Sequence, residues 1–200
     1  MTSITPIKTP EQIKKDKMFF HTPFFIAPSK SVFADRAIRF EELARDDASE
    51  WSAYLQLLSH VCEVQQAILD SQDWDFPAAT SSLILPEANG EFVPQEFQEC
   101  FAKFLDQLEQ KVPSTVLAPL RALKPEQTQT LAQACLKGEL SEQDKSLGPW
   151  LHAVLQIIWT AWAQELHEDD VPMVEQRSHC PCCGTEAVAS MVLISSDLAN

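Results

Sequence analysis

The chain contains little glycine, with four glycines in 200 residues. Phosphate-binding loops and the nucleophile elbow of hydrolases need glycines at fixed spacing, and neither pattern occurs. The His-Glu-x-x-His motif of zinc proteases is also absent. These absences argue against an ordinary enzyme and favour a protein that acts through binding.

Basic residues are scarce as well. Fifteen Lys and Arg stand against 29 Asp and Glu, which gives a net charge of −14 at pH 7. Such a chain repels the phosphate backbone, so we expect no nucleic-acid partner. The same charge favours a partner with a basic segment, although a merely solvated acidic surface is the alternative reading.

Long hydrophobic runs are missing too. The run from Met18 to Ile26 is interrupted by His21 and Pro23. The run after Pro149 is interrupted by His152 and Gln156 and ends before Glu165. A membrane-spanning helix needs about 20 apolar residues, so the sequence predicts no span.

The compartment is indicated by the cysteines and by the N-terminal residues. Six cysteines, three clustered and three scattered, do not form the regular framework of a small secreted domain. No twin-arginine pair precedes the first apolar run, so we do not expect the chain to use that export route. We therefore expect a cytoplasmic protein.

Apolar residues recur at helical spacing through the middle of the chain, which predicts a mainly α fold. The predicted organisation is an extended arm over 1–30, a helical bundle domain over 31–168, and a hinge with a partial knuckle over 169–200. Helices are expected at Val32–Arg45, Glu50–Asp70, Pro94–Lys111, Pro125 to Gly138 and Pro149–Glu165. Pro113 and Pro119 are expected to break the stretch after Lys111 into short pieces, one of which contains Val116–Leu123.

Several isolated residues on these helices have a structural and a functional interpretation. Cys62, Cys100 and Cys135 are expected in the core as small hydrophobic residues. His60 is expected at the surface or the core edge, and His152 in the core with a satisfied hydrogen bond. The helix after Pro149 is apolar almost all round, so it is predicted to be the central helix of the bundle.

The C-terminal part contains the motif Cys180-Pro181-Cys182-Cys183-Gly184. Pro181 fixes φ after the first thiol and Gly184 permits positive φ after the second, so the turn aims Cys180 and Cys183 at one point. This geometry predicts a metal-binding knuckle of the kind that holds zinc through thiolates. A C-x-x-C oxidoreductase would instead need a helix after the first thiol, and the residues that follow are strand-like.

A tetrahedral site needs four ligands, and this motif supplies two. The other cysteines form no second C-x-x-C pair, and no Cys or His follows Cys183. By its spacing, the chain therefore carries half of a metal site, the first knuckle of an incomplete zinc-ribbon-type element. We expect either that the chain is truncated or that another molecule completes the site. Two chains of a homodimer sharing one metal would do so.

Several short motifs stand in a characteristic order along the chain. Around the cysteine pair lie Glu175-Gln-Arg, Cys180-Pro181-x-Cys183-Gly184 and Ala189-Ser190-Met191-Val192. Upstream lie Asp35-Arg36-Ala37-x-Arg39-Phe40-x-x-Leu43-Ala44, Tyr54-Leu55-Gln56 with Gln65, and Pro149-Trp150 to Trp162-Ala163-Gln164. As an ordered set from about Ser31 to Ile194, they resemble the formate dehydrogenase accessory proteins of the FdhE type.

This resemblance implies a non-catalytic cytoplasmic factor that binds the catalytic subunit of respiratory formate dehydrogenase and is needed for its activity. It also implies a helical N-terminal domain followed by rubredoxin-like knuckles that bind iron or zinc. Two alternatives stay open: a helical chaperone that guards twin-arginine signal peptides of molybdenum enzymes, and a small metal-binding redox module.

Overall fold

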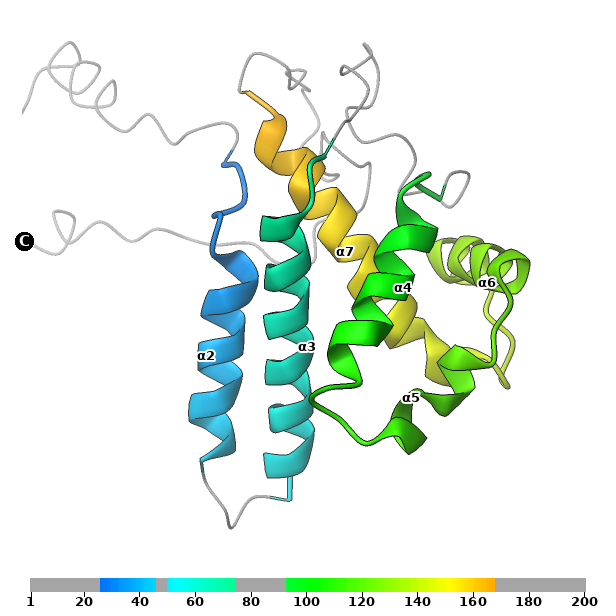
Figure 1. Cartoon of the computed structure of the whole chain (residues 1–200), viewed down its shortest axis with the longest axis horizontal. Helices are drawn as coiled ribbons and strands as arrows, with labels where there is room; N and C mark the ends of the chain where they lie inside the picture. The colour runs from blue at the N-terminus through cyan, green and yellow to red at the C-terminus, as the bar shows by residue number, and fades with distance from the viewer. Residues whose placement is uncertain (1–25, 46–49, 75–92, 168–200) are drawn as a thin grey trace, which may run out of the picture.

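The computed structural model describes residues 26–45, 50–74 and 93–167, and within these ranges it is helical without strands (Figure 1). The predicted mainly α fold is confirmed. No helix in the described ranges is long and apolar enough to cross a membrane. The helical elements are α2 Val32–Ala44, α3 Ser52–Ser71, α4 Phe97–Leu108, α5 Ser114–Arg121, α6 Pro125–Lys137, the short 3-10 helix η1 Lys145–Leu147, and α7 Gly148–Glu165.

Helices α2 and α3 form an antiparallel pair at one side of the molecule (Figure 1). Phe33 and Ala37 of α2 are buried at their contact, as the predicted apolar stripe required. Two hydroxyl groups of α3 fix the register of the pair by donating to carbonyl oxygens of α2. Ser59 Oγ lies 2.9 Å from the oxygen of Ala37, and Ser52 Oγ lies 2.7 Å from the oxygen of Ala44.

Helix α7 lies at the centre and contacts α3, α4 and α6, which confirms its predicted place. Its buried side chains include Leu151, Val154, Leu155, Ile157 and Ile158, each fully shielded from solvent. Burying a side chain of this size contributes about 1.5–3 kcal/mol. The hydrophobic core is therefore organised around α7.

One buried amide joins α3 to α7. Gln65, which is 2% exposed, donates from Nε2 to the carbonyl oxygen of Ala153 at 2.8 Å. The Oε1 atom of Gln156 lies 3.4 Å from the same nitrogen. A buried amide needs such partners because leaving it unpaired costs about 1–3 kcal/mol. Gln65 therefore sets the rotation of α3 about its own axis.

The ends of α6 follow from its sequence. Pro125 stands at the first turn, where its missing N–H costs nothing, and Gln127 accepts a hydrogen bond from the backbone of Lys124 at 3.0 Å. Gly138 ends the helix with φ of 71°, a left-handed conformation that glycine adopts without strain. Both predicted ends are confirmed.

The segment before α2 is bound to the helical body. Gln66 Nε2 of α3 donates to the oxygen of Lys30 at 2.8 Å, and Gln164 Nε2 of α7 donates to the oxygen of Ser29 at 3.0 Å. Gln66 Oε1 also accepts from the N–H of Ala34 at 3.0 Å, which satisfies a free donor in the first turn of α2. The predicted arm over 1–30 and the segment over 169–200 fall largely outside the described residues, so these boundaries stay predictions.

Three expectations from the sequence were wrong. His152 is exposed rather than in the core, because no described element covers that flank of α7. Trp51 and Tyr54 lie at the helical spacing of the apolar residues over 50–70, which predicts that they are buried, but they are 64% and 52% exposed, because they precede the part of α3 that meets α7. Pro119 lies inside α5 instead of breaking it. The carbonyl that Pro119 leaves unpaired, that of Thr115, belongs to an exposed residue that water can reach.

Replacing Gln65 by leucine tests the connection between α3 and α7. We expect the free energy of unfolding to fall by about 1–2 kcal/mol, because the amide hydrogen bond in a buried site is lost. Urea denaturation followed by circular dichroism measures the change. The matched control is Gln110→Leu at an exposed position after α4. Equal stability of the two variants would contradict the structural role of Gln65.

Candidate functional site

The predicted metal ligands Cys180 and Cys183 lie outside the described residues. Among the residues that the structure does describe, no group of three or more His, Cys, Asp or Glu side chains could hold a metal ion. The prediction of an iron or zinc knuckle is therefore carried by the sequence alone.

The three remaining cysteines lie in the core, as expected. Cys62, Cys100 and Cys135 are free thiols and are 6%, 0% and 7% exposed. Burial raises the pKa of all three thiols, that of Cys100 to about 12. A thiol with a raised pKa stays protonated at neutral pH and is a poor nucleophile or metal ligand. These residues are structural.

One face of α3 is left open by the packing of the bundle. Because α3 turns its buried residues toward α7 and α4, the opposite face lies between α2 on one side and the turn after α4 on the other (Figure 1). The open face of α3 consists of residues at helical spacing: Ala53, Gln56, Leu57, His60, Glu63, Gln66, Ala67 and Asp70.

Two grooves run along this open face. The first, of about 390 Å³, lies between α2 and α3. Its lining is formed by Ala34, Ala37, Ile38 and Glu41 of α2 with Glu63, Gln66, Ala67 and Asp70 of α3. The second, of about 280 Å³, lies between α3 and the start of α5. It is lined by Ala53, Gln56, Leu57 and His60 of α3 with Lys111, Val112, Pro113 and Val116.

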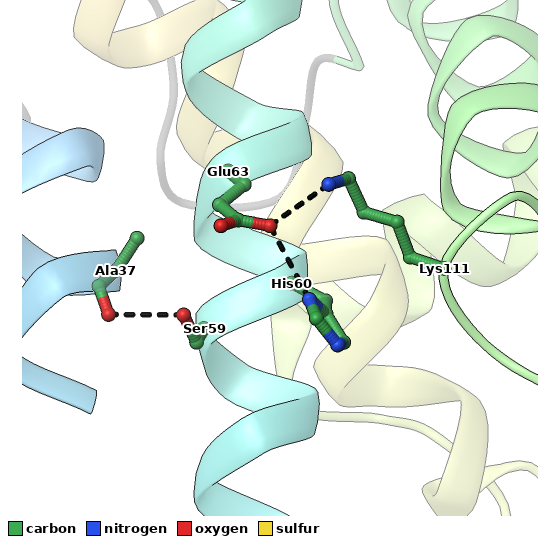
Figure 2. Close-up of polar contacts among 5 residues, drawn as sticks. All are labelled: Ala37, Ser59, His60, Glu63 and Lys111. Atoms are coloured by element: carbon green, nitrogen blue, oxygen red, sulfur yellow. Dashed lines mark hydrogen bonds and ion pairs between the residues drawn. The ribbon is translucent and has the colours of Figure 1, made fainter. Parts of the chain in front are cut away.

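A polar cluster separates the two grooves (Figure 2). One oxygen of Glu63, Oε2, lies 2.9 Å from Lys111 Nζ and 3.2 Å from His60 Nδ1. The hydrogen bond from Lys111 is the main reason that the pKa of Glu63 is lowered, and the contact with His60 adds to it. The cluster therefore fixes the turn after α4 against α3 and keeps the Glu63 carboxylate ionised.

The chemistry of the open face is that of a contact surface. The imidazole, the ammonium and the carboxylate of the cluster are paired with one another. The rest of the lining consists of small or aliphatic side chains, neutral amides and two further carboxylates, Glu41 and Asp70. Such a surface can bind a partner segment through apolar contact and charge.

Sequence reasoning found some of these residues and missed others. His60 is half-buried at the core edge, as predicted. Glu63 and Lys111 were missed, because a contact between residues 48 positions apart leaves no local signal. Glu41, Ala67 and Asp70 were missed as well. Each residue lies on an exposed face of its own helix. Only the packing of α2 against α3 brings the two faces together as a groove.

The fold and the site define the class as an α-helical bundle domain with two grooves on one face. Residues 22–175 match the family model "FdhE, N-terminal". The chain belongs to this family, which confirms the resemblance seen in the sequence.

Known relatives agree with this assignment. A protein named "Protein FdhE homolog" from Stutzerimonas stutzeri is 28% identical over 195 residues, which cover 85% of this chain and 59% of the relative. A protein of the same name from Pseudomonas aeruginosa is 29% identical over 182 residues, covering 85% and 58%. The chain thus spans just under three-fifths of the length of these relatives.

A solved structure is similar as well. The crystal structure of the FdhE protein from Pseudomonas aeruginosa aligns with a TM-score of 0.59 at 29% identity, covering 82% of this chain and 61% of that one. The helical arrangement described above is therefore shared with a solved member of the family.

Replacing Glu63 by glutamine tests the polar cluster. Because the folded carboxyl has a lowered pKa, its contribution to stability is present above the unfolded pKa and is lost as pH falls through the folded pKa. Both partners are exposed by more than a third, so we expect a loss of about 0–1 kcal/mol at pH 7. Urea denaturation at pH 7 and at pH 3 measures the difference. A penalty that grew on acidification would contradict the account.

Proposed function

We propose that this protein is an accessory factor for respiratory formate dehydrogenase. It binds the catalytic subunit in the cytoplasm and is needed for that subunit to become active. The observation that carries the proposal is membership of the FdhE family over residues 22–175. Since this match comprises every helix in the part of the chain that the structure describes, we assign the binding function to the helical domain.

The surface chemistry supports binding as the mode of action. Both grooves are open to solvent, whereas a small-molecule site commonly encloses most of its ligand. The residues that line the grooves include both aliphatic and charged side chains, as the residues of protein interfaces do. A partner segment would cover the open face of α3 without any change in the core.

A cytoplasmic site of action is consistent with the thiols. Cys62, Cys100 and Cys135 are free in the folded domain. Reduced cysteines are the usual state in the cytoplasm, where disulfides are rare. The catalytic subunit would then be met before it leaves that compartment.

The cysteine pair carries a second, separate proposal: Cys180 and Cys183 bind iron or zinc. The donor set is chemically suitable, since both metals accept thiolate ligands, but it supplies two of the four corners of a tetrahedron. Two chains that contribute one pair each would complete the site. The metal would then act as a structural link between two copies.

A genetic and a capture experiment test the main proposal together. In a strain without this chain, we expect formate-dependent dye reduction to fall to the level of a strain without the catalytic subunit. Supplying the chain in trans should restore it. The tagged chain should also capture the catalytic subunit made without its leader peptide. Unchanged activity in the deletion strain would contradict the proposal, and capture of the leader alone would support the signal-peptide chaperone instead.

Metal analysis after anaerobic purification tests the cysteine proposal. We expect one iron or zinc per two chains, lost in Cys183→Ser. The matched control is Cys182→Ser, which alters the neighbouring thiol of the same turn and should keep the metal. A metal-free monomer under reducing conditions would reject the shared site.

A further inference from the structure

The open face of α3 is long for a ligand site. From Ala53 to Asp70 it extends about 25 Å at 1.5 Å per residue. The Glu63 cluster separates the two grooves, and along α3 the residues that line the second groove (53–60) precede those that line the first (63–70). A surface of this length suits an elongated segment of a partner protein.

Small side chains line the first groove: Ala34 and Ala37 of α2 and Ala67 of α3. Packed helices lie about 8–10 Å apart, and small side chains at the contact allow the closer values. Ile38 stands beside this lining with 57% of its surface exposed and offers apolar area for a partner to cover.

The charge of the first groove has one sign. Its lining holds three carboxylates, Glu41, Glu63 and Asp70, and no Lys, Arg or His. Lys111 and His60, which line the second groove, pair with Glu63 and offset its negative charge. At the rim, Glu41 has a 3.5 Å contact with the exposed Arg45, and Asp70 accepts a bond from the neutral amide of Gln66 at 2.9 Å. Two exposed carboxylates thus flank an apolar floor.

We infer that the first groove binds a helical segment of the mature catalytic subunit that carries Lys or Arg beside small or apolar residues. This inference rests on the proposed function and adds to it the surface and the chemistry of the partner. Basic side chains would pair with Glu41 and Asp70, while the apolar side of the segment covers Ile38 and Ala67. The net charge of −14 adds a long-range attraction for a basic segment.

Charge reversal at the rim tests the inference. The full chain carrying Glu41→Lys with Asp70→Lys is compared with a control carrying Glu139→Lys with Glu142→Lys. The control makes the same change of net charge beyond the C-terminal end of α6, away from α2 and α3 (Figure 1). We expect the rim variant to bind the leaderless catalytic subunit about ten-fold more weakly and with a smaller salt dependence. The control should bind within about two-fold of the unaltered chain.

Shape is tested separately from charge. Ala67→Trp fills the groove floor at an exposed position and should also weaken binding, without any change of charge. If the double reversal lowers the unfolding midpoint, the neutral pair Glu41→Gln with Asp70→Asn replaces it, and a weaker loss in the same direction is expected.

The outcomes separate this inference from the proposed function. If the unaltered chain does not capture the subunit, the proposed function fails. If it does, but rim, floor and control variants all bind equally well, only the groove inference fails. The inference is also overturned if the rim variant abolishes self-association instead, seen by light scattering, because a second copy would then be the occupant.

Discussion

The buried contact between α3 and α7 is the constraint on which the rest of the structure depends. Helix α7 carries the most apolar sequence of the chain and is shielded by α3, α4 and α6. Gln65 donates to the backbone of α7 from within that contact, so α3 cannot rotate without stranding a buried amide. Once this rotation is set, the direction of every other side chain on α3 follows.

The polar residues of α3 meet neighbours on two different sides as a result. Ser52 and Ser59 bond to carbonyls of α2, and Gln66 satisfies the first turn of that helix. Glu63, one turn after Ser59, directs its carboxylate to the side opposite that of Ser59, where it accepts a hydrogen bond from Lys111 (Figure 2). Apolar burial holds the helices together, while these bonds decide which face of α3 stays open. The grooves are therefore a consequence of how α3 is fixed.

Much of the fold could be predicted from the sequence, because helix ends and apolar spacing are local properties. Pro125 and Gly138 mark both ends of α6, and Cys100 of α4 lies in the core, as expected for a small hydrophobic residue. The wrong predictions concern which helices lie beside a given residue. The apolar sequence around His152 indicates burial but does not say which flank lacks a covering helix. The cysteine pair was visible because its spacing is local, whereas the open face of α3 arises from helices distant in sequence.

Site-specific photocrosslinking tests the central claim most directly. A photoreactive phenylalanine analogue at Ala67, in the floor of the groove, is compared with the same analogue at Thr130, exposed on α6. Both chains are illuminated in cells that produce the catalytic subunit. The account predicts a crosslink to that subunit from position 67 and none from position 130. A crosslink from position 130 alone would show that the subunit binds the other side of the bundle and would contradict the account.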